Sequence, residues 1–386
     1  SVGVPGTPAV LGKLHERFGK TDIQKLIEPA VTLAMDGFAP SRGLFESLQN
    51  DIGRLGKNKK TKEYFYNKKI IKNKNYADVL KTFANEGHNM FYKFPISTNI
   101  INAVNKKNGV LTQKDFDRYN VIERKPVCGI FQKHKVCSMG EPSSGALTML
   151  QILKLIDHNP TWHNYIEASK LAFADRNYYM ADPDFVKTPG KHLISDKYIL
   201  KRRRLISSEN IINDAQHGTP ASWKENTQAS YYGPNESGTT HISIIDQYGN
   251  AISMTSTIEN AFGSRIMANG YLLNNELTDF SFSPKKNNNL VANRVQAGKR
   301  PRSSMTPTIV FSTSTNKPTL IIGSAGGSRI IGYVTQRIID VLYNNMSLED
   351  AINAPHILNR GGNIEAEEET SITNNLSQKG HLLDIT

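Results

Sequence analysis

The sequence has 386 residues, a formal net charge of +12 at pH 7 and only two cysteines. A chain of this length buries about three quarters of its unfolded surface, so it needs no disulfide framework or metal to hold a core. No apolar stretch of about 18 residues occurs, which excludes a transmembrane helix within these residues. The basic excess is spread along the chain, so we interpret it as a solvated surface and not as a nucleic-acid site.

The first part of the chain is predicted to be helical. Pro8 opens one helix, and Thr21-Asp22 caps a second over residues 23–37, whose apolar positions keep helical spacing. Residues 57–75 are rich in Lys and Asn and contain three aromatic residues. Basic residues interleaved with aromatics can mark a nucleic-acid surface, but the segment is short, and we expect a surface loop.

The middle of the chain is predicted to hold a strand pair followed by helices. Cys128 and Cys137 lie on two short predicted strands, where we expect two buried free thiols. A cross-strand disulfide is the alternative in an oxidising compartment. Helices are predicted over residues 144–156 and 164–180, and the basic run 201–204 is expected to be a solvated helix end.

From Thr239 onward the pattern favours strands, after a polar loop over residues 232–238. Residues 240–258 alternate apolar with Ser and Thr around the turn Tyr248-Gly249-Asn250, which predicts a hairpin. Helices, then strands, then a further helix indicate helical layers over antiparallel sheets. The further strands are predicted at residues 270–274, 306–312 and 318–323, and the helix at residues 328–343.

The common catalytic templates are absent from the sequence. It contains no GxGxxG, Walker A, HExxH or GxSxG motif, and its ten histidines show no metal-ligand spacing. A Thr hydroxyl is a poor nucleophile unless a base takes its proton, and the α-amine of a Thr freed by a backbone cut can be that base. Gly238-Thr239 offers such a bond. Gly326-Gly327, which precede a predicted helix, are candidates for an oxyanion hole.

Several blocks of the sequence follow one another in the order SVGVPGTPAV, PSSGA, FADRNYYMADPDFV, ESGTTHISIIDQYGNAISMTSTI, FGS, LLNNELTDFS, GKRPRSSMTPTIV and GSAGGSRI. In sequence and in order, these blocks resemble the γ-glutamyltransferases, which are N-terminal nucleophile hydrolases. The resemblance implies an α+β fold, a four-layer αββα sandwich, with a large-subunit-like region at residues 1–238 and a small-subunit-like region at 239–386. It also implies self-cleavage between Gly238 and Thr239 into two fragments that form a heterodimer.

The same resemblance implies a role for each candidate site residue. Thr239 would be the nucleophile and Thr257 would support its hydroxyl, while Gly326 and Gly327 would form the oxyanion hole. Carboxylates would hold the α-ammonium of the substrate, and hydroxyls its α-carboxylate, because a zwitterionic head needs acceptors at one end and donors at the other. The carboxylates are Glu259, Glu276 and Asp279, and the hydroxyls are those of Ser303 and Ser304.

The implied activity is transfer of a γ-glutamyl group from glutathione or similar amides to water, an amino acid or a dipeptide. No cofactor, metal or nucleic-acid partner is expected. The alternatives are a γ-polyglutamate depolymerase or an acylase of the same fold, and an uncleaved inactive fragment. The family is usually exported, which implies a periplasmic or extracellular location.

Two departures from the family pattern shape these expectations. The chain starts at SVGVPGT, without the family's preceding Arg that clamps the α-carboxylate, and it stops at LLDIT, before the usual last strands. We therefore expect a chain truncated at both ends. The loop between Asp279 and Lys299 is shorter than the lid loop of many members and lacks Tyr, which implies an open site.

Overall fold

The computed structural model describes residues 1–66, 68–221, 223, 230 and 238–385. The chain divides into two units, which are described separately. Unit 1 comprises residues 1–123 and 257–278, and unit 2 comprises residues 124–256 and 279–386. The predicted boundary between residues 238 and 239 lies within unit 2 and concerns cleavage, so it stays a prediction. Most of the polar loop predicted over residues 232–238 lies outside the described residues.

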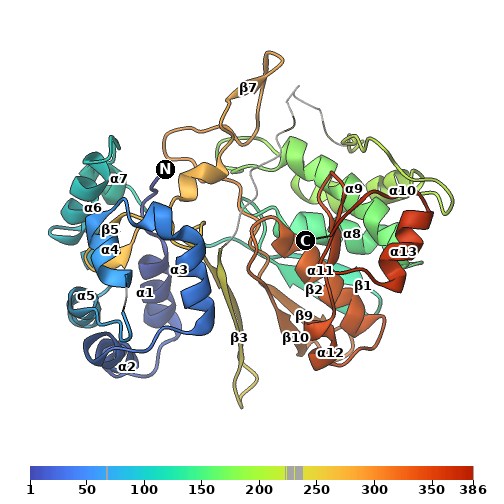
Figure 1. Ribbon diagram of the computed structural model, residues 1–386. Coiled ribbons are helices and arrows are strands. Elements are labelled where there is room, and N and C mark those ends of the chain that lie inside the picture. Colours follow the sequence, from blue (N-terminus) through green and yellow to red (C-terminus); the bar gives the residue numbers. More distant parts are fainter. Residues whose placement is uncertain (67, 222, 224–229, 231–237, 386) are drawn as a thin grey trace. The chain divides into compact units, whose positions relative to one another are not determined.

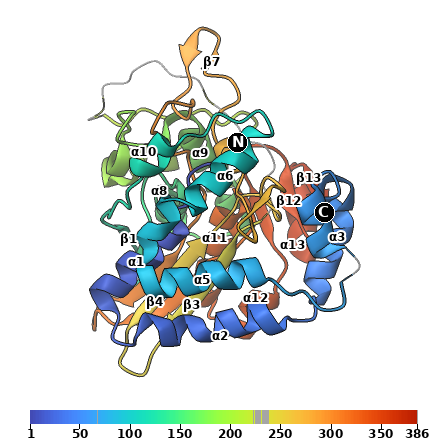
Figure 2. The same cartoon turned by 90° about the vertical axis from the view of Figure 1, so that its left-hand side faces the viewer.

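Unit 1 consists mainly of helices (Figure 1). Helix α2 (Ile23–Asp36) begins at Asp22, whose carboxylate accepts a hydrogen bond from the Gln24 N–H at 2.7 Å, as expected for an N-cap. It lies beside α5 (Lys74–Glu86), as Figure 2 shows. The other elements are α1 (Thr7–Phe18), α3 (Arg42–Leu55), α4 (Lys59–Phe65), the 3₁₀ helix η1 (His88–Tyr92), α6 (Ile96–Asn105), α7 (Gln113–Asp117), β5 (Met267–Ala268) and β6 (Tyr271–Leu272).

The lysine-rich segment differs from the expected surface loop. Its residues 59–65 form α4, which Asn58 caps by accepting a hydrogen bond from the Thr61 N–H at 3.3 Å. Thr61 is fully buried, and the ring of Phe65 stands edge-on to Phe262 with centroids 5.6 Å apart. The prediction of a loop is therefore wrong for residues 59–65, because one side of this segment packs into unit 1 while its lysines remain outside.

Unit 2 is built around a four-stranded antiparallel sheet in the order β1–β2–β9–β10. Helix α8 (Gly145–Ile156) packs on β1 and β2 and also contacts α9 (Trp162–Tyr179) and α11 (Arg329–Leu342). Because α8 is apolar on nearly all sides, it is buried along almost its whole length. The strands are β1 (Val127–Phe131), β2 (His134–Ser138), β9 (Thr308–Ser312) and β10 (Pro318–Ile322).

The two cysteines form a disulfide, so the expectation of two free thiols is wrong. Cys128 and Cys137 lie directly opposite each other in the β1–β2 ladder, with Cα atoms 4.1 Å apart. Directly opposed residues of an antiparallel pair share a face of the sheet, which brings the two sulfur atoms together. The predicted hairpin was correct, and the cross-strand disulfide given as the alternative is the state of the two cysteines.

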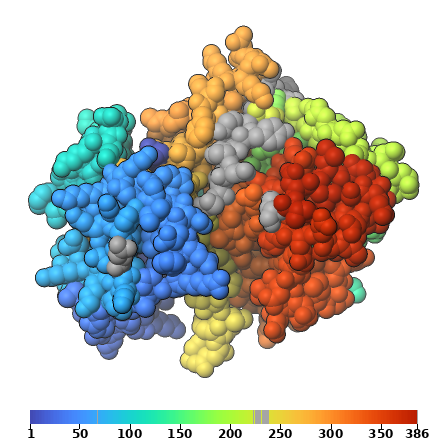
Figure 3. All heavy atoms as spheres, viewed as in Figure 1, coloured from blue at the N-terminus to red at the C-terminus, as the bar shows by residue number. Residues whose placement is uncertain are grey.

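The predicted second hairpin is formed by β3 (Thr240–Ile245) and β4 (Ala251–Ser256). Its polar face contacts β10, because the hydroxyl of Ser243 donates to the Ile321 carbonyl at 3.2 Å and that of Ser253 to the Ile322 carbonyl at 3.1 Å. The opposite, isoleucine-bearing face is half exposed, with Ile244 at 49%. The tip of the hairpin forms the yellow projection in Figure 3.

The basic run at residues 201–204 is also more deeply placed than expected. It ends helix α10 (Asp196–Arg203), and Arg202 is buried there against Asp175, with Nη2 and Oδ1 3.3 Å apart. The prediction of a solvated helix end is wrong for Arg202, whose charge is paired inside unit 2. The remaining elements of unit 2 are the 3₁₀ helix η2 (Gly190–Ile194), β7 (Lys285–Lys286), β8 (Asn289–Leu290), α12 (Leu348–Asn353), β11 (Ile357–Asn359), β12 (Ile364–Ala366), α13 (Ser371–Gln378) and β13 (Leu383–Ile385).

Candidate active site

The bond predicted for self-cleavage lies directly before β3. The backbone N–H of Gly326 donates a hydrogen bond to the carbonyl oxygen of Gly238, with an N···O distance of 3.1 Å. That carbonyl belongs to the Gly238–Thr239 peptide bond, and its carbon is the atom that a Thr239 hydroxyl would attack. A backbone donor on this oxygen is the arrangement that an oxyanion hole provides. Unit 2 therefore brings the predicted cleavage point and one predicted oxyanion donor together.

The backbone at the predicted nucleophile is strained. Thr239 has a φ of 89°, in a region that a β-branched residue rarely adopts. Such a conformation costs on the order of 1–3 kcal/mol and persists only where the surrounding structure enforces it. Cleavage before Thr239 would remove this restraint, because the φ of a chain's first residue no longer involves a preceding carbonyl.

The two candidate oxyanion residues precede a helix, as predicted. Gly326 and Gly327 have φ values of 119° and 58°, which glycine adopts without a steric penalty. A Cβ built on Gly326 would lie 2.9 Å from Cε2 of Tyr333, so the site requires the absence of a side chain there. Helix α11 follows with Ser328 as its N-cap, and its N-terminus favours negative charge.

Sequence reasoning did not select His241, which connects β3 to the end of β10. Its Nδ1 lies 2.8 Å from Oγ1 of Thr255, and its Nε2 lies 3.0 Å from Oγ of Ser243. Burial lowers the pKa of His241 below its ordinary value. A Cβ on Gly323 would lie only 2.1–2.6 Å from the ring. This contact holds β3 against the start of the loop of residues 323–328. No local sequence pattern predicts it.

The candidate carboxylate-binding hydroxyls each accept an N–H bond. Nη2 of Arg176 donates to Oγ of Ser304 at 2.6 Å, and the backbone N–H of Met305 donates to Oγ of Ser303 at 3.1 Å. A hydroxyl that accepts from a cation keeps its own proton for another acceptor, such as a carboxylate. Arg176 is buried and also donates through Nε to Oγ of Ser144 at 2.8 Å, so its direction is set. Arg176 lies in a block that carried the family resemblance, but nothing in its spacing pointed to Ser304.

Asp279 is tied to the serine pair through one buried amide. Nδ2 of Asn293 donates to the Asp279 carbonyl at 2.6 Å, and Oδ1 of Asn293 accepts from the backbone N–H of Arg302 at 2.9 Å. Arg302 directly precedes the two serines. Asn293 is 1% exposed, so both bonds are shielded from water. The candidate ammonium and carboxylate ligands of unit 2 are thus held by a common bridge.

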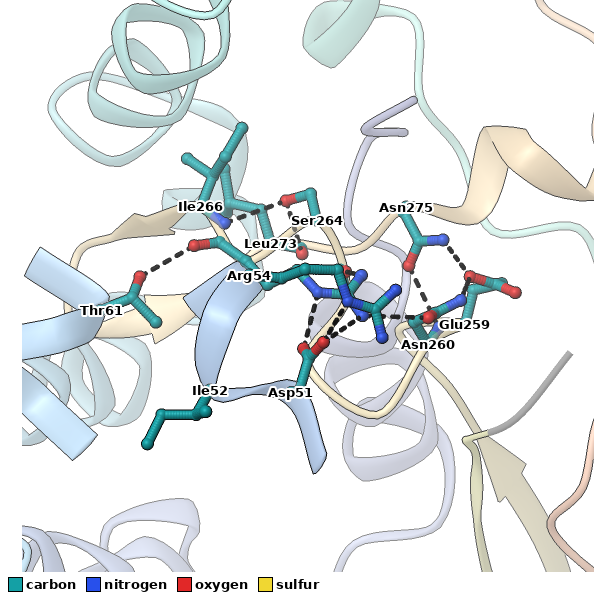
Figure 4. Close-up of polar contacts among 12 residues, drawn as sticks. Asp51, Ile52, Arg54, Thr61, Glu259, Asn260, Ser264, Ile266, Leu273 and Asn275 are labelled. Atoms are coloured by element: carbon teal, nitrogen blue, oxygen red, sulfur yellow. Dashed lines mark hydrogen bonds and ion pairs between the residues drawn. The ribbon is translucent and has the colours of Figure 1, made fainter. Parts of the chain in front are cut away.

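Three further candidates belong to unit 1. The backbone N–H of Glu259 donates to Oγ1 of Thr257 at 2.8 Å. Figure 4 shows the carboxylate of Glu259 beside the amides of Asn260 and Asn275, both of which donate to its Oε2. Glu276 begins the short 3₁₀ helix η3 (Glu276–Asp279), and its N–H donates to Oδ1 of Asn274 at 3.0 Å. The roles of these residues, including support of Thr239 by Thr257, stay predictions.

Metal-binding clusters and membrane-spanning helices are both absent from the residues that the structure describes. Among these residues, no group of three or more His, Cys, Asp and Glu side chains could hold a metal ion. None of the described helices combines the length and the apolar character needed to cross a membrane.

Comparisons with known proteins identify the family of this chain. The family model for gamma-glutamyltranspeptidase matches residues 1–386. The chain is 34% identical over 381 residues to the glutathione hydrolase proenzyme of Bacillus subtilis (strain 168). The aligned part covers 92% of this chain and 64% of the relative. The chain thus spans about two thirds of that relative's length.

Two solved structures are similar to this chain. The cephalosporin acylase from Bacillus halodurans has a TM-score of 0.85 at 21% identity, over 100% of this chain and 72% of the other. The gamma-glutamyltranspeptidase of Helicobacter pylori has a TM-score of 0.55 at 30% identity, over 58% of this chain and 70% of the other. These similarities confirm the α+β fold of N-terminal nucleophile hydrolase type that the sequence predicted. Because the family model matches residues 1–386 of this chain, the chain belongs to the gamma-glutamyltranspeptidase family.

Proposed function

We propose that this chain is the major part of a self-processing γ-glutamyl transferase and hydrolase with Thr239 as its nucleophile. The observation that carries the proposal is the hydrogen bond from the Gly326 N–H to the Gly238 carbonyl oxygen at 3.1 Å. It puts an oxyanion donor on the one carbonyl whose cleavage would free Thr239. The strained φ of 89° at Thr239 supports the same bond as the cleavage point.

Self-cleavage would proceed in two balanced steps. The Thr239 hydroxyl attacks the Gly238 carbonyl carbon, a C–O ester bond forms, the C–N bond breaks, and the hydroxyl proton passes to the leaving nitrogen. Water then hydrolyses the ester, which leaves a carboxylate on Gly238 and restores the Thr239 hydroxyl beside a free α-amine. The products would be fragments of 238 and 386 − 238 = 148 residues, which would stay together as a heterodimer.

The mature site would use the same atoms on a donor amide. The α-amine of Thr239, whose pKa lies near 8, accepts the hydroxyl proton as the oxygen attacks the γ-amide carbon. A γ-glutamyl ester forms and the amine of the donor leaves with that proton. Water or the amine of an amino acid or dipeptide then takes the γ-glutamyl group. The Gly326 and Gly327 N–H groups would stabilise the oxyanion in both halves of the reaction.

Substrate recognition would rest on opposite charges at the two ends of the glutamyl head. The hydroxyls of Ser303 and Ser304 would donate to the α-carboxylate. Glu259, Glu276 and Asp279 would accept from the α-ammonium, since charge-assisted hydrogen bonds are the stronger ones. Glutathione and related γ-glutamyl amides have both groups.

A second candidate function is that of an acylase. The fold similarity to the Bacillus halodurans cephalosporin acylase, with a TM-score of 0.85, favours it. However, a glutaryl side chain lacks an α-ammonium, as do the interior residues of a γ-linked glutamate polymer. Because Glu259, Glu276 and Asp279 are proposed as acceptors for an ammonium, we favour a free γ-glutamyl donor over both alternatives.

The cellular location of the protein is a further part of the proposal. We infer that the protein works in the periplasm or outside the cell. The Cys128–Cys137 disulfide supports this location, because disulfides persist in oxidising compartments and are rare in the cytosol.

The proposal is tested by purifying the chain and sequencing the N-terminus of any smaller fragment, which should begin at Thr239. Thr239→Ala should remain one intact chain without activity, while Thr239→Ser keeps a hydroxyl and should still cleave. A chromogenic γ-glutamyl anilide should be hydrolysed faster than the glutaryl anilide. A wild-type chain that stays at 43.0 kDa and inactive would instead support the uncleaved-fragment alternative, and a fragment beginning at another residue would overturn the nucleophile assignment.

A further inference from the structure

We infer that Asp51 and Arg265 are positioning residues that orient the carboxylate of Glu259 and thereby set a preference for donors with a free α-ammonium. This inference rests on the proposed function, because it takes Glu259 as an ammonium ligand. It adds two residues that would act on substrate choice without touching substrate. Asp51 is far from Glu259 in sequence, and Arg265 lies in the same connection between β4 and β5 as Glu259.

A chain of polar contacts within unit 1 connects these residues. Nε of Arg265 donates to Oδ2 of Asp51 at 2.7 Å, and Nη2 lies 3.3 Å from the other carboxylate oxygen. The same Nη2 donates to Oδ1 of Asn260 at 3.1 Å. Nδ2 of Asn260 in turn donates to Oε2 of Glu259 at 2.5 Å. Figure 4 shows Asp51 of α3 on one side of this network and Glu259 on the other.

The guanidinium of Arg265 determines which way the Asn260 amide faces. A side-chain amide has an acceptor oxygen and a donor nitrogen, and a guanidinium can only donate. Because Oδ1 of Asn260 accepts from Arg265, Nδ2 must turn toward Glu259. Asn275 acts from the other side: its Oδ1 accepts from the Asn260 N–H at 3.1 Å, and its Nδ2 donates to Glu259.

Both amides bind the same oxygen of Glu259, which is Oε2. Oε1 accepts no hydrogen bond from the residues that the structure describes, so it is left for a ligand. Glu259 is 6% exposed and its φ is 73°, a strained backbone that holds the carboxylate in place. The second oxygen of this carboxylate can accept from a bound cation, and such charge-assisted hydrogen bonds are the stronger ones.

The charges of the network point to the class of ligand. Asp51 is 5% exposed and neutralises Arg265, while Arg54 binds the same carboxylate from the surface. Among the described residues, the carboxylate of Glu259 accepts hydrogen bonds only from neutral amides, so a cationic ligand would be its charged partner. A primary ammonium suits the Glu259 carboxylate, because it supplies both a positive charge and a hydrogen-bond donor.

A purely structural role for Arg265 makes a different prediction. Its Nη1 donates to the Gly263 carbonyl at 2.7 Å, and the Arg265 carbonyl accepts from the Thr61 hydroxyl at 2.8 Å, so the residue also braces its own loop. A loop brace would affect every donor alike. A positioning residue for Glu259 would affect only donors that have an α-ammonium.

The experiment compares the γ-glutamyl anilide with the glutaryl anilide, which lacks the α-ammonium, on the self-cleaved protein. Arg265→Met and Asp51→Asn should raise KM for the γ-glutamyl donor about 10- to 100-fold, as expected for one or two hydrogen bonds to a charged group. The kcat/KM for the glutaryl donor should stay within about twofold. Arg265→Lys should recover part of the discrimination, because it restores the ion pair with Asp51.

Arg54→Gln is the matched control. The native Arg54 binds the same Asp51 carboxylate, but its side chain is 63% exposed and is not hydrogen-bonded to Asn260. Both donors should therefore react with Arg54→Gln as they do with the wild type. If the Arg265 variants do not fold or self-cleave, Asn260→Ala replaces them, since it removes the connecting amide and leaves the Arg265–Asp51 pair in place. Its discrimination between the two donors should fall in the same way.

The possible outcomes separate the two levels of the proposal. Equal losses with both donors, or an unchanged KM for the γ-glutamyl donor, would overturn the positioning role while leaving the proposed function intact. A wild-type chain that cleaves neither itself nor a γ-glutamyl donor would overturn the proposed function, and this inference with it.

Discussion

The imidazole of His241 occupies the space that a side chain at Gly323 would need. A Cβ on Gly323 would lie 2.1 Å from Cε1 of that ring, which itself bridges Thr255 and Ser243. Because Gly323 directly follows β10 and His241 lies two residues after Thr239, this contact aligns β3 with the loop of residues 323–328, which contains Gly326. The position of Thr239 relative to Gly326 therefore depends on the absence of a side chain at Gly323.

Gly323→Ala should disturb this alignment. Overpacking of this kind costs about 1–3 kcal/mol, so we expect a lower melting temperature and slower self-cleavage, followed on a denaturing gel. Gly362→Ala is the matched control, because a Cβ there meets nothing within 4 Å. His241→Ala in the Gly323→Ala background should recover part of the stability. An unchanged rate of cleavage in Gly323→Ala would show that the contact does not align the site.

Arg176 should matter for donors with an α-carboxylate. Its Nη2 donates to Oγ of Ser304 at 2.6 Å and directs the hydroxyl proton toward a ligand. We expect Ser304→Ala to raise KM for the γ-glutamyl anilide about tenfold, the usual effect of one charge-assisted bond. Reaction with the 4-aminobutanoyl anilide, which lacks the carboxylate, should hardly change.

Arg176→Lys provides the second arm of that test. It keeps the charge but loses the forked geometry that reaches Ser144 and Ser304 together. Its effect should not add to that of Ser304→Ala, because both act through one hydroxyl. Additive effects of the two substitutions would contradict the assignment.

Acid should destabilise unit 2 through His381. Burial, with the nearby charges of Lys170, His163 and Lys379, lowers the pKa of His381 from its ordinary 6.5 to about 4. Between these values the unfolded chain binds a proton that the folded chain does not, so stability falls as pH falls from 6.5 to about 4. The loss from this group is at most roughly 3 kcal/mol.

Melting temperatures measured across this pH range check the prediction. His381→Gln should make the decline shallower, since the substituted side chain does not titrate. His158→Gln, at an exposed position of the same unit, is the control. A slope that is identical in the wild type and His381→Gln would exclude His381 as a source of acid sensitivity.

The disulfide should contribute stability without being required for the fold. It closes a short loop of sequence separation 9, for which chain-entropy arguments give about 2–3 kcal/mol. The Cys128→Ser/Cys137→Ser double variant should therefore melt several degrees lower and still self-cleave, because α8 and the sheet supply the core. A reducing agent should lower the melting temperature of the wild type but not that of the double variant. Loss of folding in the double variant would contradict this.

Much of the local structure could be predicted because its causes are local. The Asp22 cap of α2, the turn at residues 248–250 and the glycine pair before α11 each depend on residues within a few positions of one another. The resemblance to the γ-glutamyltransferases likewise depended on short blocks of sequence in a fixed order. From these the fold class and the family could be predicted correctly.

The errors share a different cause. Arg202 belongs to a basic run that indicates a solvated helix end, and only the distant Asp175 makes its burial favourable. The lysines around α4 favour an exposed loop, but Thr61 of this segment is buried and its hydroxyl donates to the distant carbonyl of Arg265. The hairpin predicted for Cys128 and Cys137 already placed the two thiols near each other, but the sequence did not decide whether they are oxidised.

The sequence by itself determined where helices and turns begin, which bond is the candidate for cleavage and which chemistry that bond permits, because these follow from neighbouring residues. Only the tertiary structure decided which donor meets the Gly238 carbonyl, which cation orients Ser304 and which ring fills the space beside Gly323. These pairs lie far apart in the chain, and their distances depend on how whole elements pack. Periodicity within one segment has no information about that packing.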